Sequence, residues 1–179
     1  MPRRRVVTYH LEMLAPSRLV PAAVAGGELA LVQAVRPLPE LGRFLYQAVG
    51  GDWYWIDRLP WSRERWERRL SRREVELWVL NEEGVPAGYF ELEVQPADRS
   101  VEIVYFGLLP ANTGRGLGGF LLTRAVERAW SLGQPRVWVH TCTLDHPAAL
   151  ANYRARGFTL FKETVTFVDL PQRPPTLWG

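Results

Sequence analysis

Four glycines fall within six residues near the middle of the chain, in the segment Asn112-Thr113-Gly114-Arg115-Gly116-Leu117-Gly118-Gly119. An apolar run typical of a strand precedes this segment, and an amphipathic run typical of a helix follows it. Backbone N–H groups at such a junction, together with the positive end of the helix dipole, form an anion site. Glycine suits the position because a side chain would keep a phosphate away from the backbone. The segment predicts phosphate binding, with a plain tight turn as the alternative interpretation.

The same glycines also match a dinucleotide-binding fingerprint, because Gly114, Gly116 and Gly119 satisfy G-x-G-x-x-G. That fingerprint belongs in the first strand-to-helix turn of a parallel βαβ unit. Here the turn lies more than halfway along the chain. It follows three predicted strands, over residues 76–80, 86–94 and 101–109, whose short connections indicate an antiparallel meander. The context therefore disfavours a dinucleotide site.

The remaining pattern predicts one α+β domain. Apolar periodicity and breakers predict further strands over residues 6–13, 29–35, 136–141 and 158–168, and helices over residues 40–49, 63–72, 115–132 and 147–156. Ser62 is the expected N-cap of the second helix, and Pro147 is the expected first residue of the last one. We find no internal repeat and no linker.

Two motifs resemble those of the GCN5-related N-acetyltransferase (GNAT) family. The segment from Thr113 to Gly118 is similar to the family's Q/R-x-x-G-x-G/A loop, and residues 146–158, HPAALANYRARGF, are similar to its N-x-A-A-x-x-x-Y-x-x-x-G-F helix and turn. The order of elements matches from about residue 76 to residue 168. The resemblance implies a mixed, mostly antiparallel sheet flanked by helices. It divides the chain into an N-terminal strand and loop (1–28), acceptor-side elements (29–75), an acetyl-CoA-binding core (76–168) and a tail (169–179).

The resemblance implies acetyl-CoA as the donor, with its pyrophosphate on the glycine loop and its pantetheine arm along the end of the third meander strand. The residues expected to contact it are Leu108, Leu109, Thr113, Gly114, Arg115, Gly116, Leu117, Gly118, Gly119 and His146. Two positions depart from the family pattern: Thr113 replaces Gln or Arg, and His146 replaces an Asn that often contacts the arm. Arg115 remains available as a charge-assisted donor to phosphate oxygens.

Tyr153 matches the family's tyrosine that gives a proton to the departing thiolate. A phenol suits this role because its pKa near ~10 keeps it protonated at neutral pH. A buried structural tyrosine is the alternative. Glu102 is the candidate base, because its strand resembles that of the family's histone-modifying members. A water base, a solvent-facing Glu102, or Glu91 or Glu93 on the neighbouring strand are the alternatives.

The acceptor is expected between the predicted helices at residues 40–73. Trp53, Tyr54 and Trp55, with Trp61 nearby, would supply aromatic walls for an apolar amine or for a cation on a ring face. Packing between the helices and the sheet is the competing role for these side chains. The resemblance thus implies N-acyl transfer to a primary amine of a small molecule or peptide, by direct attack in a ternary complex.

Composition excludes some other classes of protein. A single cysteine, Cys142, rules out a disulfide scaffold, and no apolar run is long enough for a membrane span. The sequence shows no metal-ligand spacing and no secretory leader, so we expect no metal and a cytoplasmic monomer or homodimer. The 21 arginines and one lysine raise the alternative of nucleic-acid binding, but they are scattered along amphipathic helices. A non-catalytic acyl-CoA sensor on the same fold is the second alternative.

Overall fold

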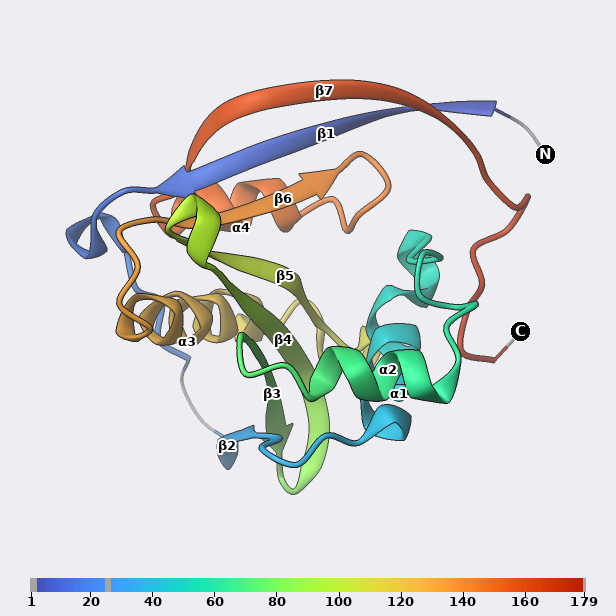
Figure 1. Cartoon of the computed structure of the whole chain (residues 1–179), viewed down its shortest axis with the longest axis horizontal. Coiled ribbons are helices and arrows are strands. Elements are labelled where there is room, and N and C mark those ends of the chain that lie inside the picture. Colours follow the sequence, from blue (N-terminus) through green and yellow to red (C-terminus); the bar gives the residue numbers. More distant parts are fainter. Residues whose placement is uncertain (1–2, 25–26, 179) are drawn as a thin grey trace.

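All seven strands of the chain join one sheet, in a computed structural model that describes residues 3–24 and 27–178 (Figure 1). Positions 1, 2, 25, 26 and 179, which belong to the predicted N-terminal strand and loop and to the predicted tail, lie outside the described residues. The strands are β1 (Arg3–Met13), β2 (Leu29–Gln33), β3 (Val75–Glu82), β4 (Val85–Gln95), β5 (Ser100–Leu108), β6 (Val137–Cys142) and β7 (Thr159–Asp169). The helices are α1 (Pro39–Gly50), α2 (Arg63–Leu70), α3 (Leu117–Ser131) and α4 (Ala149–Ala155).

The sheet order is β2-β3-β4-β5-β6-β1-β7, and only β5 and β6 run parallel. The predicted mixed, mostly antiparallel sheet and the β3-β4-β5 meander are therefore confirmed. A parallel pair needs a long crossover, and α3 supplies it between β5 and β6. None of the described helices combines the length and the apolar character that crossing a bilayer requires.

The first strand of the chain lies far from the second. β1 pairs with β6 on one side and, over Arg3–Glu12, with β7 on the other, so β7 forms the far edge of the sheet (Figure 1). Local sequence pattern predicts a strand here but carries no signal for its neighbours. After β7, the chain returns past the turn that follows α1, where a Cβ on Gly51 would come within 2.9 Å of the Pro175 carbonyl oxygen.

Two apolar clusters cover the two faces of the sheet. The larger one joins the sheet to α3 and α4 through side chains such as Phe90, Ile103, Leu121 and Phe158. The smaller one joins the opposite face to α1 through Leu45, Val49, Val79 and Tyr89. The single domain is thus three-layered, and a site that opens through the sheet can receive one ligand from each face.

Two predicted helix starts are wrong. The third helix begins at Leu117 instead of residue 115, because Gly114 and Gly116 take positive φ values of 76° and 79°. The fourth begins at Ala149, so Pro147 is not its first residue. There the His146 ring accepts a hydrogen bond from the Ala148 backbone N–H at 3.0 Å, and residues 146–148 form a turn before the helix. The predicted Ser62 cap of α2 is confirmed, since its hydroxyl accepts from the Arg65 N–H.

Candidate active site

A cleft opens where β5 and β6 separate. The two strands pair only over Val101–Ile103 and Val137–Val139, and no pair follows among the described residues. Beyond that point residues 104–108 and 140–142 form two walls of a cleft of about 710 Å³. This volume lies within the usual range of small-molecule binding sites.

A β-bulge on β5 marks the point of separation. Ile103 lies opposite Leu92 and Tyr105 lies opposite Glu91, so Val104 has no partner on β4. The bulge keeps Tyr105 on the α1 side of the sheet, where it packs in the smaller apolar cluster. Ile103 and Phe106 face the larger cluster on the α3 side. The cleft therefore has walls from both faces of the sheet.

The glycine loop forms one end of the cleft. Thr113, Gly114, Gly116, Gly118 and Gly119 line it. A Cβ on Gly114 or Gly116 would meet no atom within 4 Å, so the positive φ values of these residues leave open space beside the backbone. The first N–H groups of α3 point out of the helix end without intrahelical acceptors. This open, donor-rich loop fits a pyrophosphate, as the sequence predicts.

Three of the residues expected at the cofactor do not line the cleft. The Arg115 guanidinium forms two hydrogen bonds with the Glu82 carboxylate, at 2.8 and 2.5 Å. Leu117 is buried, and Leu109 packs against the smaller apolar cluster. Leu108 and His146 do line the cleft. The structure therefore places the loop backbone at the cleft and occupies the arginine with a carboxylate.

Tyr153 on α4 lines the cleft and is 5 % exposed. Its ring packs edge-on against Phe106 and Phe158, with centroids 6.0 and 6.1 Å apart. No described residue hydrogen bonds to its hydroxyl, so the phenol is available to a ligand. Burial raises the pKa of Tyr153 well above 10, which keeps the hydroxyl protonated.

The other end of the cleft is aromatic. Trp53, Tyr54 and Trp55 all line it, within a segment that we call the acceptor loop (residues 53–57). The Trp55 ring sits directly on the Gly50 backbone, where a Cβ would approach within 2.0 Å of the indole. Its Nε1 donates to Asp145 Oδ1 at 3.1 Å. Trp61 lies off the cleft and packs against Trp66.

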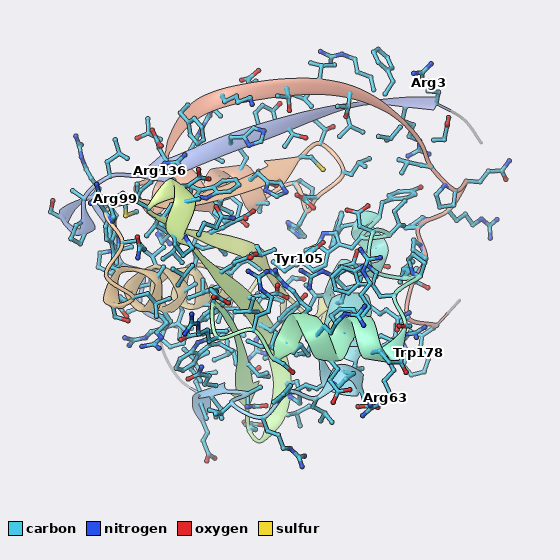
Figure 2. All side chains as sticks on the ribbon, in the orientation of Figure 1. Arg3, Arg63, Arg99, Tyr105, Arg136 and Trp178 are labelled. Carbon is cyan, nitrogen blue, oxygen red and sulfur yellow. The ribbon has the colours of Figure 1, made fainter. Side chains whose placement is uncertain are left out.

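The charges around the cleft have one sign. Asp57, Asp145 and Asp169 line it, and no Lys or Arg does so among the described residues. This contrasts with a chain that carries 22 Lys and Arg. Figure 2 shows Tyr105, a wall residue, toward the middle of the molecule and Arg63, Arg99 and Arg136 away from it. This aromatic end of the cleft therefore carries negative charge as well.

Glu102, the base expected from the sequence, does not line the cleft. Glu102 is 8 % exposed, and its carboxylate accepts a hydrogen bond from Gln95 Nε2 at 2.6 Å. Its other oxygen lies 3.4 Å from Nδ1 of His140, which does line the cleft. The structure therefore puts Glu102 one residue behind the wall, with His140 between it and the open space.

Sequence reasoning missed several wall residues. The position of Tyr105 on the cleft wall depends on the bulge at Val104, which no sequence pattern predicts. Asp145 accepts hydrogen bonds from Thr141 Oγ1 at 2.7 Å and from the Cys142 backbone N–H at 2.9 Å, and an aspartate before a predicted helix was its only signal. Asn152 donates to the Gly118 carbonyl oxygen at 3.2 Å and so ties α4 to the glycine loop.

Comparison with known proteins identifies the family. The model of the acetyltransferase (GNAT) family matches residues 43–158. A mycothiol acetyltransferase from Jonesia denitrificans is 31 % identical over 121 residues, which cover 60 % of this chain and 38 % of that protein. The chain thus spans well under half the length of this curated relative.

Solved structures share the fold. A GCN5-related N-acetyltransferase from Kribbella flavida superposes with a TM-score of 0.66 at 18 % identity, over 92 % of this chain and 59 % of that chain. An aminoglycoside acetyltransferase from an uncultured soil metagenomic sample gives a TM-score of 0.63 at 16 % identity, over 80 % of this chain and 97 % of that chain. At these identities the likeness concerns the fold alone.

Proposed function

The chain belongs to the GNAT family of acetyltransferases, and we propose that it transfers an acetyl group from acetyl-CoA to a primary amine of a small molecule or peptide. The observation that carries this proposal is the cleft through the sheet, which has a phosphate-type loop at one end and an electronegative aromatic pocket at the other. Tyr153 lines the same cleft. The arrangement suits direct transfer in a ternary complex, because donor and acceptor can meet inside one cleft.

The donor end fits coenzyme A. Gly114 and Gly116 leave room beside the backbone, and the start of α3 supplies N–H donors for the pyrophosphate. Thr113, Gly118 and Gly119 complete the loop, and Leu108 on the free end of β5 would lie along the pantetheine arm. Bound acetyl-CoA supplies the thioester carbonyl that an amine attacks. Arg115 would reach a phosphate only after leaving Glu82, so we assign the holding of the phosphates to the backbone.

Tyr153 supplies a proton to the departing sulfur. Its hydroxyl faces the cleft without a described protein partner, and burial holds its pKa well above the working pH. A neutral phenol can therefore donate as the sulfur gains negative charge. The neighbouring rings of Phe106 and Phe158 fix the direction of the phenol.

The acceptor end fits an amine. Three carboxylates line the described part of the cleft and no Lys or Arg does, so the wall attracts an ammonium group and disfavours an anion. The rings of Trp53, Tyr54 and Trp55 add apolar walls and cation-binding faces. The Tyr54 ring already shows this capacity, since the Arg4 guanidinium lies 5.4 Å from its centroid.

The test combines binding with turnover on the whole chain. Thermal unfolding with acetyl-CoA reports donor binding, and thiol release on a panel of diamines, amino sugars and peptide N-termini reports transfer. We expect a rise in melting temperature and amine-dependent release, with the acetylated amine confirmed by mass spectrometry. Binding without release on any amine would favour the acyl-CoA sensor instead.

A further inference from the structure

The side chain best placed to accept a proton in the cleft is a histidine to which the sequence pattern assigns no catalytic role. His140 lies one residue beyond Val139, the last β6 residue paired with β5, and it lines the cleft. It is 45 % exposed, so a ligand can reach its ring. Val104, the unpaired residue of the bulge, lines the same cleft at the corresponding point of β5.

We propose that His140 takes the proton from the acceptor amine and that Glu102 positions His140 from behind. This inference rests on the proposed function and reassigns the base from Glu102, which does not reach the cleft. His140 Nδ1 lies 3.4 Å from Glu102 Oε1. A proton on Nδ1, facing the carboxylate, leaves Nε2 as the free acceptor, and no described residue occupies Nε2.

A chain of hydrogen bonds holds Glu102 in place. Trp138 Nε1 donates to Gln95 Oε1 at 3.1 Å, which orients the amide so that Gln95 Nε2 donates to Glu102 Oε2 at 2.6 Å. Trp138 is the register partner of Glu102 and lies two residues before His140, so all three side chains share one face of the sheet. The second oxygen of Glu102 is then left for His140.

Acid and base reach the cleft from opposite faces of the sheet. Tyr153 packs in the cluster that contains Ile103 and Val139, on the α3 side. His140 alternates with Val139 along β6 and therefore points to the other side, where Tyr105 and the acceptor loop lie. The base thus lies on the acceptor side and the acid on the donor side, as transfer between two ligands requires.

Protons and electrons balance in the transfer step. As the lone pair of the neutral amine forms the new N–C bond, His140 Nε2 takes the proton that the nitrogen loses. The C–S bond breaks with its electron pair on sulfur, and the sulfur takes the proton of the Tyr153 hydroxyl. Solvent then returns one proton from the imidazolium to the phenolate. The products are the amide and the free thiol.

Several charged groups face His140. Glu102 raises the pKa of the imidazole through its contact with Nδ1, burial opposes this, and Asp145 and Asp57 add to the rise. His10 on β1 faces it with ring centroids 5.9 Å apart. The net direction is upward from the usual value near ~6.5. His140 therefore gains its proton-accepting form as the pH rises through a value above that.

The test is the pH profile of kcat/KM with an active amine. We expect His140→Gln to lower kcat about 10- to 1000-fold, within the range of general-base effects, and to remove the acidic limb that His140 imposes. Glu102→Gln should shift that limb to lower pH, because the carboxylate that raises the pKa is gone. His10→Gln is the matched control, a histidine of the same ring cluster that does not line the cleft, and should keep a limb.

A second readout needs no substrate. The chain has three histidines, so NMR titration with His10→Gln and His146→Gln spectra assigns the His140 imidazole. We expect Glu102→Gln to lower its pKa, and His140→Gln to keep the thermal shift with acetyl-CoA. An unchanged acidic limb in His140→Gln, or its loss only in Glu102→Gln, would overturn the proposal while leaving acetyl transfer intact. A wild-type protein inactive on every amine would overturn the proposed function, and this inference with it.

Discussion

Arg58 and Glu91 form a two-armed ion pair beneath the acceptor loop, with Nη1–Oε2 and Nη2–Oε1 distances of 2.6 and 2.9 Å. Arg58 is 6 % and Glu91 1 % exposed, and Arg69 adds a second cation to the same carboxylate at 2.6 Å. The Arg58 guanidinium also lies 4.5 Å from the centroid of the Tyr105 ring, a wall of the cleft. This pair therefore joins the segment after the acceptor loop to β4.

Replacing Arg58 with leucine should lower the free energy of unfolding by about 3–5 kcal/mol, the usual effect of leaving one member of a buried pair behind. Glu91 would keep only Arg69 while still buried. Urea unfolding measures the change. Arg63→Leu is the control, because Arg63 pairs with Glu40 at the surface and should change stability little. Equal effects of the two variants would contradict a structural role for the Arg58 pair.

A second ion pair makes stability depend on pH. Arg128 binds Glu76 through two contacts of 2.6 and 2.9 Å, and Trp78 Nε1 donates to the same carboxylate at 2.8 Å. Burial of Glu76 opposes these contacts, but the net effect is a pKa below the usual range. A group whose pKa is lowered by folding stabilises the protein at pH values above its unfolded-state pKa, near ~4.3. This stabilisation is lost as the pH falls through the folded-state pKa.

We therefore expect Glu76→Gln to be less stable than wild type at pH 7, and the difference to shrink as the pH approaches 3. The measurement is urea unfolding at several pH values. Glu127→Gln, which removes an exposed pair with Arg124, should follow the wild type throughout. A Glu76→Gln deficit that stays constant between pH 7 and pH 3 would speak against the ionic contribution.

The sequence predicts the elements better than it predicts their neighbours. Glycines and apolar periodicity indicate the β3-β4-β5 meander and the loop before α3, because these features depend on residues close in the chain. The place of β1 between β6 and β7 depends on contacts between residues such as His10 and His140, 130 positions apart, which no local pattern carries. The bulge at Val104, which changes the alternation of side chains along β5 so that Tyr105 faces the α1 side, also has no signal in the sequence.

The same limit explains the candidate site. Tyr153 and the glycines belong to contiguous motifs, so the resemblance finds them, and the structure puts them on the cleft. Arg115 is adjacent to the loop in sequence, but Glu82 from β3 occupies it. Glu102 has the expected residue type, yet the side-chain direction set by the sheet puts His140 in front of it.

Gly116 offers a direct test of the donor end. Gly116→Ala should weaken acetyl-CoA binding roughly tenfold or more, because the added Cβ enters the open space beside the loop backbone at φ +79°. Gly84→Ala is a matched control, since Gly84 has φ +81° and equally open surroundings but lies in the β3–β4 turn off the cleft. Both variants should lose stability by roughly 1 kcal/mol from left-handed strain. Calorimetric titration would contradict the assignment if the two bound acetyl-CoA equally.

Tyr153→Phe isolates the hydroxyl. The ring contacts with Phe106 and Phe158 stay, so we expect kcat to fall ~10- to 1000-fold while acetyl-CoA affinity changes little. Because burial holds the pKa of Tyr153 well above 10, the hydroxyl should impose no basic limb on the wild-type profile below that pH. Phe158→Leu is the control for packing: it removes one ring contact but keeps the hydroxyl, so it should lower kcat less than Tyr153→Phe does. A Tyr153→Phe enzyme with wild-type kcat would remove the hydroxyl from the reaction.

Asp57 tests the charge preference of the acceptor end. It lines the cleft, is exposed, and has no ion-pair partner among the described residues, so a cationic acceptor can approach it. Asp57→Asn should raise KM for a diamine about 1.4- to 5-fold, since an exposed charge pair is worth ~0.2–1 kcal/mol. KM for a monoamine with an apolar tail, which places only its reacting nitrogen in the cleft, should change less.

The control is Asp98→Asn. Asp98 lies in the turn between β4 and β5, away from the cleft, so this substitution should leave both KM values unchanged. Rising salt should reduce the advantage of the diamine more in the wild type than in Asp57→Asn, because the variant has one screened charge fewer on the cleft wall. A diamine preference that is the same in the two proteins at every salt concentration would remove Asp57 from acceptor recognition.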